Sequence, residues 1–543
     1  METLRMVGLR LALALLMLIP APAALALDAG SIDQAVLAPL IDGDTAARLE
    51  IISRLGQSPL PMAAQVLEAL GGGMAYADPQ GRFLVLDADK LATDPETGRR
   101  TELPADANAV IVNNRLRRAI SQALALAHLF AADPQVRLSA ARRMQHGGDP
   151  SNIGLITQAM DKEADGEVKK ALLVALASLE LKSPEAEVRL HAVQTLGNTG
   201  NAEFRPIMAN LLARQDAGAY TESSEAVRAA AAAAIERIDS RLKKIEWAGN
   251  LFYGISLGSV LLLAALGLAI TFGLMGVINM AHGELLMIGA YSTYAVQVLF
   301  RQMAPAWMDW YVLAALPVAF FITALVGMAL ERTVIRWLYG RPLETLLATW
   351  GISLILMQAV RTLFGAQNVE VGNPSWMSGG VTVLGGLVLT YNRIAIIVFA
   401  LLVVFLIWLL LNHTRLGLFV RAITQNRRMA DCVGVPTGRI DMLAFGLGSG
   451  IAGLGGVALS QLGNVGPDLG RSYIVDSFMV VVLGGVGQLA GTVIAALGLG
   501  SVNKFLEPWT GAVLAKITIL VLIVLFVQKR PQGLFAPRGR SVE

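Results

Sequence analysis

The chain has 543 residues, of which 55% are hydrophobic and 16% charged, with a formal net charge of +3. Because about a quarter of the residues in a soluble protein are charged, this composition favours a membrane protein, and so small a net charge does not favour nucleic-acid binding. The single cysteine, Cys432, excludes an internal disulfide framework and a Cys-based zinc site.

Residues 1–26 have the pattern of a secretory signal peptide. Arg5 and Arg10 precede the apolar run Leu11–Ile19, and Ala24-Leu25-Ala26 matches a small-x-small cleavage site. An uncleaved anchor is the alternative, but an apolar core of about ten residues is short for about 30 Å of hydrocarbon. The pattern predicts that the segment after Ala26 lies outside the membrane, in the periplasm.

Residues 27–246 are predicted to form a mostly helical periplasmic extension, from the three-to-four spacing of their apolar residues. Two apolar runs, Phe83–Leu86 and Val110–Val112, flank the turn-rich segment Asp94–Gly98 and are expected to pair as strands. The scattered histidines His128, His146 and His191 lack the spacing of a metal site, so we expect none.

A short pattern recurs between about residues 115 and 240, in which Val is followed by Arg or Lys and then by small apolar residues. It occurs at Val136-Arg137, Val168-Lys169, Val188-Arg189 and Val227-Arg228. The pattern resembles the starts of inner helices in HEAT-like repeats, which bury their apolar faces by stacking. Such an array serves either as a surface for a partner protein or as a spacer.

Residues 247–543 are predicted to form a polytopic helix bundle of about eight spans or re-entrant segments, because apolar runs of about 20 residues follow one another. The predicted spans are 251–278, 285–300, 311–330, 343–364, 394–411, 440–462 and 512–527. The segment 476–505 is ambiguous: its break at Gly484, Gly485, Gly487 and Gln488 is compatible with a re-entrant hairpin in the translocation path. Close helix packing through Gly487 and Gly491 is an equal alternative.

Arginines predict the orientation, because short cytoplasmic loops are rich in Lys and Arg. Two loops and the C-terminus carry them: Arg332, Arg336 and Arg341; Arg415, Arg421, Arg427, Arg428 and Arg439; and Lys529, Arg530, Arg538 and Arg540. Two predicted spans separate the loops, and three precede the first. The C-terminus is therefore expected inside and the extension outside.

Two motifs are candidate functional sites. Asn279, His282 and Glu284 lie between apolar segments, where polar groups either line a pathway or cap helix ends at the membrane boundary. In the loop 415–434, Phe419, Val420, Ile423 and Val433 are expected to share one face of a short amphipathic helix. That helix either docks into a partner ATPase or is an ordinary basic loop.

Together with Lys529–Phe535, these motifs resemble the permeases of the branched-chain amino acid family of ABC importers, over about residues 251–538. The resemblance implies a second permease subunit, cytoplasmic ABC ATPases and a periplasmic solute-binding protein as partners. It also assigns ATPase coupling to a loop whose candidate residues are Arg415, Phe419, Arg421, Ile423, Asn426, Arg427 and Gly434. The chain has no GxxxxGK[ST] loop, so ATP is expected to bind the partners, and neither enzymatic activity nor a cofactor is expected here.

The periplasmic extension departs from ordinary amino-acid permeases, which begin close to their first span. A signal peptide and a helical outer domain resemble the B-type permease subunits of urea ABC transporters, so urea is the expected solute. Branched-chain amino acids or short amides are the first alternative. A self-sufficient channel for a small neutral solute and a membrane-anchored receptor are the others.

Overall fold

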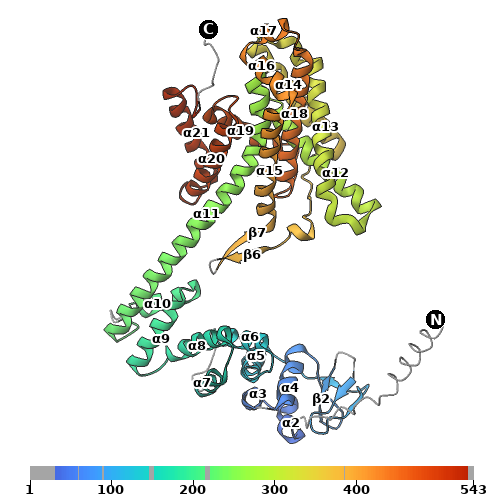
Figure 1. Cartoon of the computed structure of the whole chain (residues 1–543). Coiled ribbons are helices and arrows are strands. Elements are labelled where there is room, and N and C mark those ends of the chain that lie inside the picture. The colour runs from blue at the N-terminus through green and yellow to red at the C-terminus, as the bar shows by residue number, and fades with distance from the viewer. Residues whose placement is uncertain are drawn as a thin grey trace, which may run out of the picture. The chain divides into compact units, whose positions relative to one another are not determined.

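The computed structural model describes residues 31–58, 60–87, 91–145, 152–214, 220–383 and 386–535. The predicted signal peptide, 1–26, lies outside these residues, as do His146, Arg538 and Arg540. The chain divides into two compact units, Met1–Arg241 and Leu242–Glu543, coloured from blue to teal and from green to red in Figure 1.

The first unit begins with three helices, a small sheet and a further helix. The helices are α2 (Gln34–Asp42), α3 (Thr45–Gln57), α4 (Pro61–Gly72) and α5 (Asn114–His128). Several begin after an Asp or Asn whose side chain accepts a hydrogen bond from a backbone N–H of the first turn, as Asp44 does for α3 and Asn113 for α5. Leu37, Leu67, Phe83 and Ile120 are among the buried residues of their shared core.

The sheet corrects the expectation of a purely helical fold. Its antiparallel strands follow the order β4-β3-β2-β1-β5. They are β1 (Ala75–Ala77), β2 (Phe83–Leu86), β3 (Leu91–Thr93), β4 (Arg100–Glu102) and β5 (Asn108–Ala109). The run Phe83–Leu86 is therefore a strand, but its expected pairing with Val110–Val112 is wrong: β2 pairs with β1 and β3. Strands of two to four residues are too short for sequence periodicity to identify.

The remainder of the first unit is helical. Its elements are α6 (Pro134–Met144), α7 (Ile153–Lys162), α8 (Gly166–Glu180), α9 (Ala186–Thr199), the 3-10 turn η2 (Ala202–Phe204) and α10 (Arg205–Leu211). The long helix α11 (Glu225–Met275) begins in this unit and continues into the second. All four occurrences of the Val-basic pattern lie in the first turn of a helix, α6, α8, α9 or α11.

Three of these helices begin with the same hydrogen bonds. Nη1 of Arg137, of Arg189 and of Arg228 each donates to the carbonyl oxygens five and six residues earlier, at 2.8–2.9 Å. Arg137 and Arg189 also form bidentate ion pairs, with Glu163 before α8 and with Glu222 before α11. The repetition agrees with a stacked array, although the HEAT-like assignment stays a prediction.

The second unit is a bundle of long helices with a β-hairpin. Its helices after α11 are α12 (His282–Met303), α13 (Tyr311–Thr333), α14 (Pro342–Phe364), α15 (Tyr391–His413), α16 (Arg415–Gln425), α17 (Arg427–Cys432), α18 (Thr437–Ser460), α19 (Leu469–Gly484), α20 (Leu489–Thr510) and α21 (Ala512–Lys529). Shorter elements are the 3-10 turns η3 (Pro305–Trp310), η4 (Ile335–Leu338) and η5 (Ser375–Met377) and the hairpin β6 (Gly380–Val383) and β7 (Leu387–Thr390).

Among the described residues, seven helices are long and apolar enough to cross a membrane: α11, α13, α14, α15, α18, α20 and α21. The chain is a multi-pass membrane protein, and the mostly helical polytopic bundle is confirmed. The predicted span 285–300 lies within α12, which has the length of a span but begins with His282 and Glu284 and is not among the seven.

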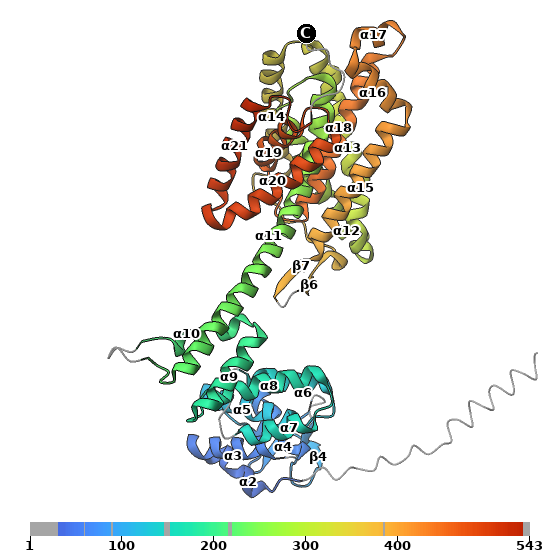
Figure 2. The ribbon, with the colours of Figure 1, turned by 60° about the vertical axis from the view of Figure 1, so that its left-hand side comes forward.

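The bundle has two distinguishable ends. Helices α16 and α17 lie at one end and the β6–β7 hairpin at the other, in both views of the ribbon (Figures 1 and 2). The guanidinium of Arg427 lies 4.9 Å from the ring of Tyr339, so the two arginine-rich loops meet at the first end. We call it the arginine end and the other the hairpin end.

The ambiguous segment 476–505 forms α19 and α20, which lie side by side. Gly487, between the two helices, packs against Gly273, near the end of α11. Phe505, near the end of α20, contacts Trp247 with 4.9 Å between ring centroids. Helix α20 thus follows α11 along the bundle instead of turning back halfway.

Helix α18 lies at the centre of the bundle, and glycines on it and on its neighbours allow close packing. A Cβ on Gly453 would lie 2.2 Å from Oγ1 of Thr323, and one on Gly289 of α12 would lie 2.2 Å from the Gly453 carbonyl oxygen. Without side chains at these positions the helix backbones approach closely, which is how membrane helices gain packing energy where the hydrophobic effect is absent.

Candidate functional site

The first predicted site lies inside the bundle, not at its end. Helix α11 ends at Met275, and a non-helical segment with Gly276 at φ +64° leads to His282, the first residue of α12. Nε2 of His282 lies 2.8 Å from the carbonyl oxygen of Ala264, eleven residues before the end of α11. At 1.5 Å per residue, that is ~16 Å along the helix axis. The motif is therefore deep in the second unit.

The three polar side chains of this motif are buried and contact different elements. Oδ1 of Asn279 accepts a hydrogen bond from the Ala281 N–H at 3.0 Å, in the turn that begins α12. Oε1 of Glu284 accepts one from the Ser353 hydroxyl of α14 at 2.9 Å. His282 instead contacts α11, so His282 and Glu284 face opposite sides of α12.

Each of these side chains also has an atom without a hydrogen-bond partner in the described part of the chain. These atoms are Asn279 Nδ2, His282 Nδ1 and Glu284 Oε2. Because a carbonyl oxygen only accepts, His282 Nε2 carries the proton and Nδ1 is a free acceptor when the ring is neutral. Unpaired buried polar atoms are costly, and inside a membrane they are functional candidates.

The second set of translocation-path candidates lies elsewhere, in the turn between α19 and α20. A Cβ on Gly484 would lie 2.5 Å from the carbonyl carbon of Gly491, and Gly485, at φ +100°, packs against the Phe535 carbonyl. Gly487, at φ +79°, and Gln488 complete the turn. Close packing accounts for this glycine run, and the structure does not bring it together with Asn279 or Glu284.

The predicted coupling loop forms two short helices at the arginine end. Ile423 is buried with Ala430, Ile440 and Ala444, and Phe419 packs partly against them. Asn426 caps α17, because its Oδ1 accepts a hydrogen bond from the Met429 N–H at 3.0 Å.

The arginines of this loop differ in their contacts. Arg415 and Arg421 are both exposed, and Nη1 of Arg421 donates to the Leu411 carbonyl at 3.0 Å. Gly434 has φ +87° and ends α17 with a turn that disfavours a side chain.

One residue of the predicted apolar face is placed differently. Val433 is 75% exposed, because it follows α17 and does not continue the face of α16. Leu418 and Met429 of the same loop are also exposed, 57% and 59%. We call these three residues the coupling surface.

A polar cluster around the buried Asp441 was not predicted from the sequence, although one of its members, Arg427, was a candidate coupling residue. Arg427 forms an ion pair with Asp441 of α18, whose side chain is completely buried. The Tyr339 hydroxyl donates to Glu331 Oε1 of α13 at 3.1 Å and lies 3.1 Å from the Met275 sulfur. The cluster thus joins α11, α13, α17 and α18. Apart from Arg427, its sequence signal was an isolated carboxylate, Asp441, near the start of an apolar helix.

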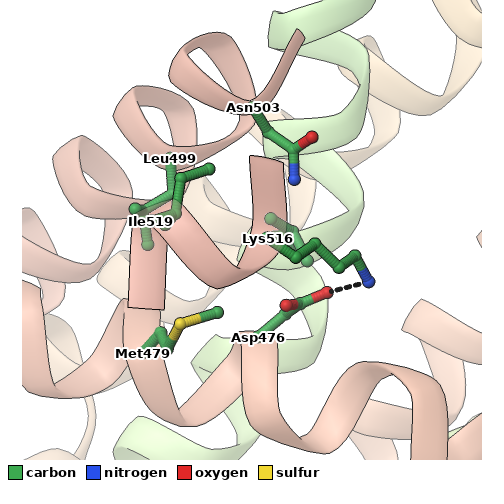
Figure 3. Close-up of a pocket in the computed structure, with 7 residues that line it drawn as sticks. Asp476, Met479, Leu499, Asn503, Lys516 and Ile519 are labelled. Carbon is green, nitrogen blue, oxygen red and sulfur yellow. Dashed lines mark hydrogen bonds and ion pairs between the residues drawn. The ribbon is translucent and has the colours of Figure 1, made fainter. Parts of the chain in front are cut away.

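A second ion pair between helices of the bundle was also not predicted. Lys516 of α21 donates to Asp476 of α19 at 2.9 Å, beside Asn503 of α20 (Figure 3). The cavity lined by these residues and by Met479, Leu499 and Ile519 has a volume of about 10 Å³. Because a single water needs about that volume, we assign this pair to helix packing.

Comparison with known proteins identifies a family for the second unit. Residues 250–527 match the family described as the permease component of branched-chain amino acid transport systems. The high-affinity branched-chain amino acid transport system permease protein BraD of Pseudomonas aeruginosa is 30% identical over 291 residues, which cover 52% of this chain and 94% of that protein.

Two other transport permeases are also similar to this chain. The corresponding permease protein LivH of Escherichia coli K12 is 28% identical over 292 residues, with the same coverage. The ribose import permease protein RbsC of the same strain is 33% identical over 107 residues, 18% of this chain and 33% of that protein. No solved structure matches the chain.

The family match covers half of the chain and almost the whole bundle. A permease component moves solute and performs no catalysis. It carries no cofactor, because ATP is bound by the partner ATPase of the transporter. The chain therefore belongs to the branched-chain amino acid family of ABC transporter permeases.

Proposed function

We propose that the chain is the permease subunit of an ATP-driven importer of urea. It works by alternating access with a second permease subunit, cytoplasmic ABC ATPases and a periplasmic solute-binding protein. Its arginine end faces the cytoplasm, in line with the arginine content of both loops there, and its first unit lies in the periplasm.

The observation that carries the coupling mechanism is the arrangement of α16 and α17. They expose the three residues of the coupling surface, while Arg427 of α17 is paired with the buried Asp441 of the central helix α18. A force from an ATPase docked on Leu418, Met429 and Val433 thereby reaches α18 through a charged contact. A self-sufficient channel needs no such surface, and membership of an ABC permease family also weighs against one.

The choice of urea rests on the part of the chain that its relatives lack. The family match begins at residue 250, and the matches to BraD and LivH cover about half of the chain. A transporter with a further unit of more than 200 residues differs in organisation from theirs, and we take its cargo to differ as well. The named cargo of BraD and LivH makes branched-chain amino acids the second candidate.

Uptake of radiolabelled urea and leucine by cells with and without this chain tests the proposal. Loss of high-affinity urea uptake on deletion, with leucine uptake unchanged, is the expected result. A parallel strain carrying an ATPase that cannot hydrolyse ATP should also lose urea uptake. Urea accumulation in that strain would contradict an ATP-driven mechanism. If deletion of the chain abolishes leucine uptake and leaves urea uptake unchanged, the solute is an amino acid and not urea.

A further inference from the structure

A hollow of about 440 Å³ opens between α18 and α19. It is lined by both polar and apolar side chains, including Asn368, Asn464, Asp468, Ser472 and Tyr473. The loop before α19 that forms much of its wall lies at the hairpin end, because the Gln461 carbonyl accepts a hydrogen bond from Asn392, just after β7.

The wall of the hollow is held by backbone pairing. Val369 and Val465 exchange N–H···O bonds of 2.8 and 2.9 Å, which fix the segment after α14 against the segment after α18. The Tyr311 hydroxyl then donates to the Gly372 carbonyl at 2.7 Å. A preformed pocket loses less free energy on ordering when a ligand binds.

An ion pair at this wall leaves a buried N–H donor without a partner among the described residues. Nη2 of Arg361, in the last turn of α14, donates to both carboxylate oxygens of Asp468, at 3.0 and 3.2 Å. Nε of Arg361 is buried and has no acceptor in the described part of the chain. The pair itself carries no net charge, yet it presents an unused N–H.

Two further unpaired groups lie nearby on α12. Glu284 and Tyr291 are seven residues apart and so share one face of the helix, and Glu284 contacts Ser353, about two turns before Arg361 in α14. The Tyr291 ring contacts that of Phe364, also in the last turn of α14, with 4.8 Å between centroids. The Tyr291 hydroxyl and Glu284 Oε2 are buried without partners among the described residues.

We propose that Arg361 and Tyr291, with Glu284 below them, form the solute-selecting site of this permease, which binds a small uncharged amide entering through the hollow. The Arg361 Nε–H and the Tyr291 O–H donate to the carbonyl oxygen of the solute, and Glu284 Oε2 accepts from its N–H. This proposal rests on the proposed urea import and adds residues to it.

The chemistry of the pair favours an amide over an amino acid. Arginine binds a carboxylate best through two parallel N–H groups, and Asp468 already engages Nη2 of Arg361. Because Asp468 neutralises the charge of the Arg361 guanidinium, the site offers a carboxylate no unpaired positive charge, whereas a carbonyl oxygen needs only the free Nε–H.

Two conservative variants in the full transporter test the site by the KM of urea uptake. Arg361→Lys keeps the charge opposite Asp468 but removes the Nε–H, and Tyr291→Phe keeps the ring against Phe364 but removes the hydroxyl. Losing one hydrogen bond should raise KM roughly three- to tenfold in each case, with little change in the maximal rate. Arg341→Lys is the matched control, since Arg341 forms a similar pair with Glu344 at 3.1 Å, away from the site.

Acetamide should compete with urea in the wild type, and its competition should weaken in both variants. If the wild type imports urea and both variants have the wild-type KM, the proposed selecting site is wrong and the proposed function stands. A wild type that imports no urea overturns the proposed function instead. A fall in maximal rate and in membrane abundance, without a change in KM, would show that the two side chains only support the fold.

Discussion

Arg427, the first residue of α17, pairs with Asp441 in the second turn of α18, and the Asp441 side chain is completely buried while that of Arg427 is 42% exposed. Substituting one partner therefore has a different consequence from substituting the other. Removing the arginine leaves a carboxylate in the protein interior, whereas removing the carboxylate leaves an arginine that reaches water. The pair also joins the coupling surface to the central helix.

This asymmetry gives a prediction for stability. Arg427→Gln should destabilise the protein by about 3 kcal/mol, because it strands the buried charge, and Asp441→Asn should cost less. The double variant should be more stable than Arg427→Gln alone, which thermal unfolding of the detergent-solubilised chain can measure. Equal losses in the two single variants would contradict the asymmetry, and a double variant whose loss equals the sum of the two single losses would mean that the two side chains are not coupled.

The coupling surface gives a prediction for assembly. Val433→Glu places a charge on an exposed apolar side chain, so it should leave folding unchanged and weaken the association with the ATPase at least about tenfold. Copurification of the ATPase and solute-stimulated ATP hydrolysis are the measurements. Gln425→Glu, also an exposed position in this loop, adds the same charge beside the surface and is the control. If both variants retain the ATPase, it docks elsewhere.

The first unit should respond to acid through Glu163. Hydrogen bonding to Arg137 lowers the pKa of Glu163 from 4.5 to about 2. A lowered folded-state pKa contributes stability that is fully present above about pH 4.5 and is lost as the pH falls towards 2. Glu163→Gln should destabilise this unit at neutral pH and flatten its acid dependence between those values.

Limited proteolysis of the full chain across this pH range, followed at sites within the first unit, measures the effect. Glu50→Gln is the control, since Glu50 pairs with Arg54 in an exposed position and surface pairs contribute little. A wild-type acid dependence retained by Glu163→Gln would assign the acid sensitivity to other groups.

Glycine packing in the bundle gives a fourth prediction. Gly289→Ala should destabilise the protein by more than about 1 kcal/mol, because its Cβ would meet the Gly453 carbonyl at 2.2 Å. Gly351→Ala in α14 has open space at its Cβ and should be neutral or slightly stabilising, since alanine favours helix. Gly289→Ala should therefore lower the unfolding temperature, whereas Gly351→Ala should leave it unchanged or raise it slightly.

Much of the architecture follows from the sequence by itself. Apolar runs long enough to cross a membrane predicted α13, α14, α15, α18 and α21 within a few residues, because a bilayer imposes length and hydropathy locally. The Val-basic pattern predicted four helix starts in the first unit for a similar reason: capping and the first turn depend on neighbouring residues.

Tertiary structure decided what depends on distant residues. The sequence left Asn279, His282 and Glu284 between a helix-end role and a pathway role, because only the return of the chain beside Ala264 places them inside the bundle. Its pairing of Phe83–Leu86 was wrong, since strand partners are chosen across the sheet. Asp441, Asp468 and Arg361 became informative only beside their partners, because burial and ion pairing are properties of the folded chain and local patterning does not encode them.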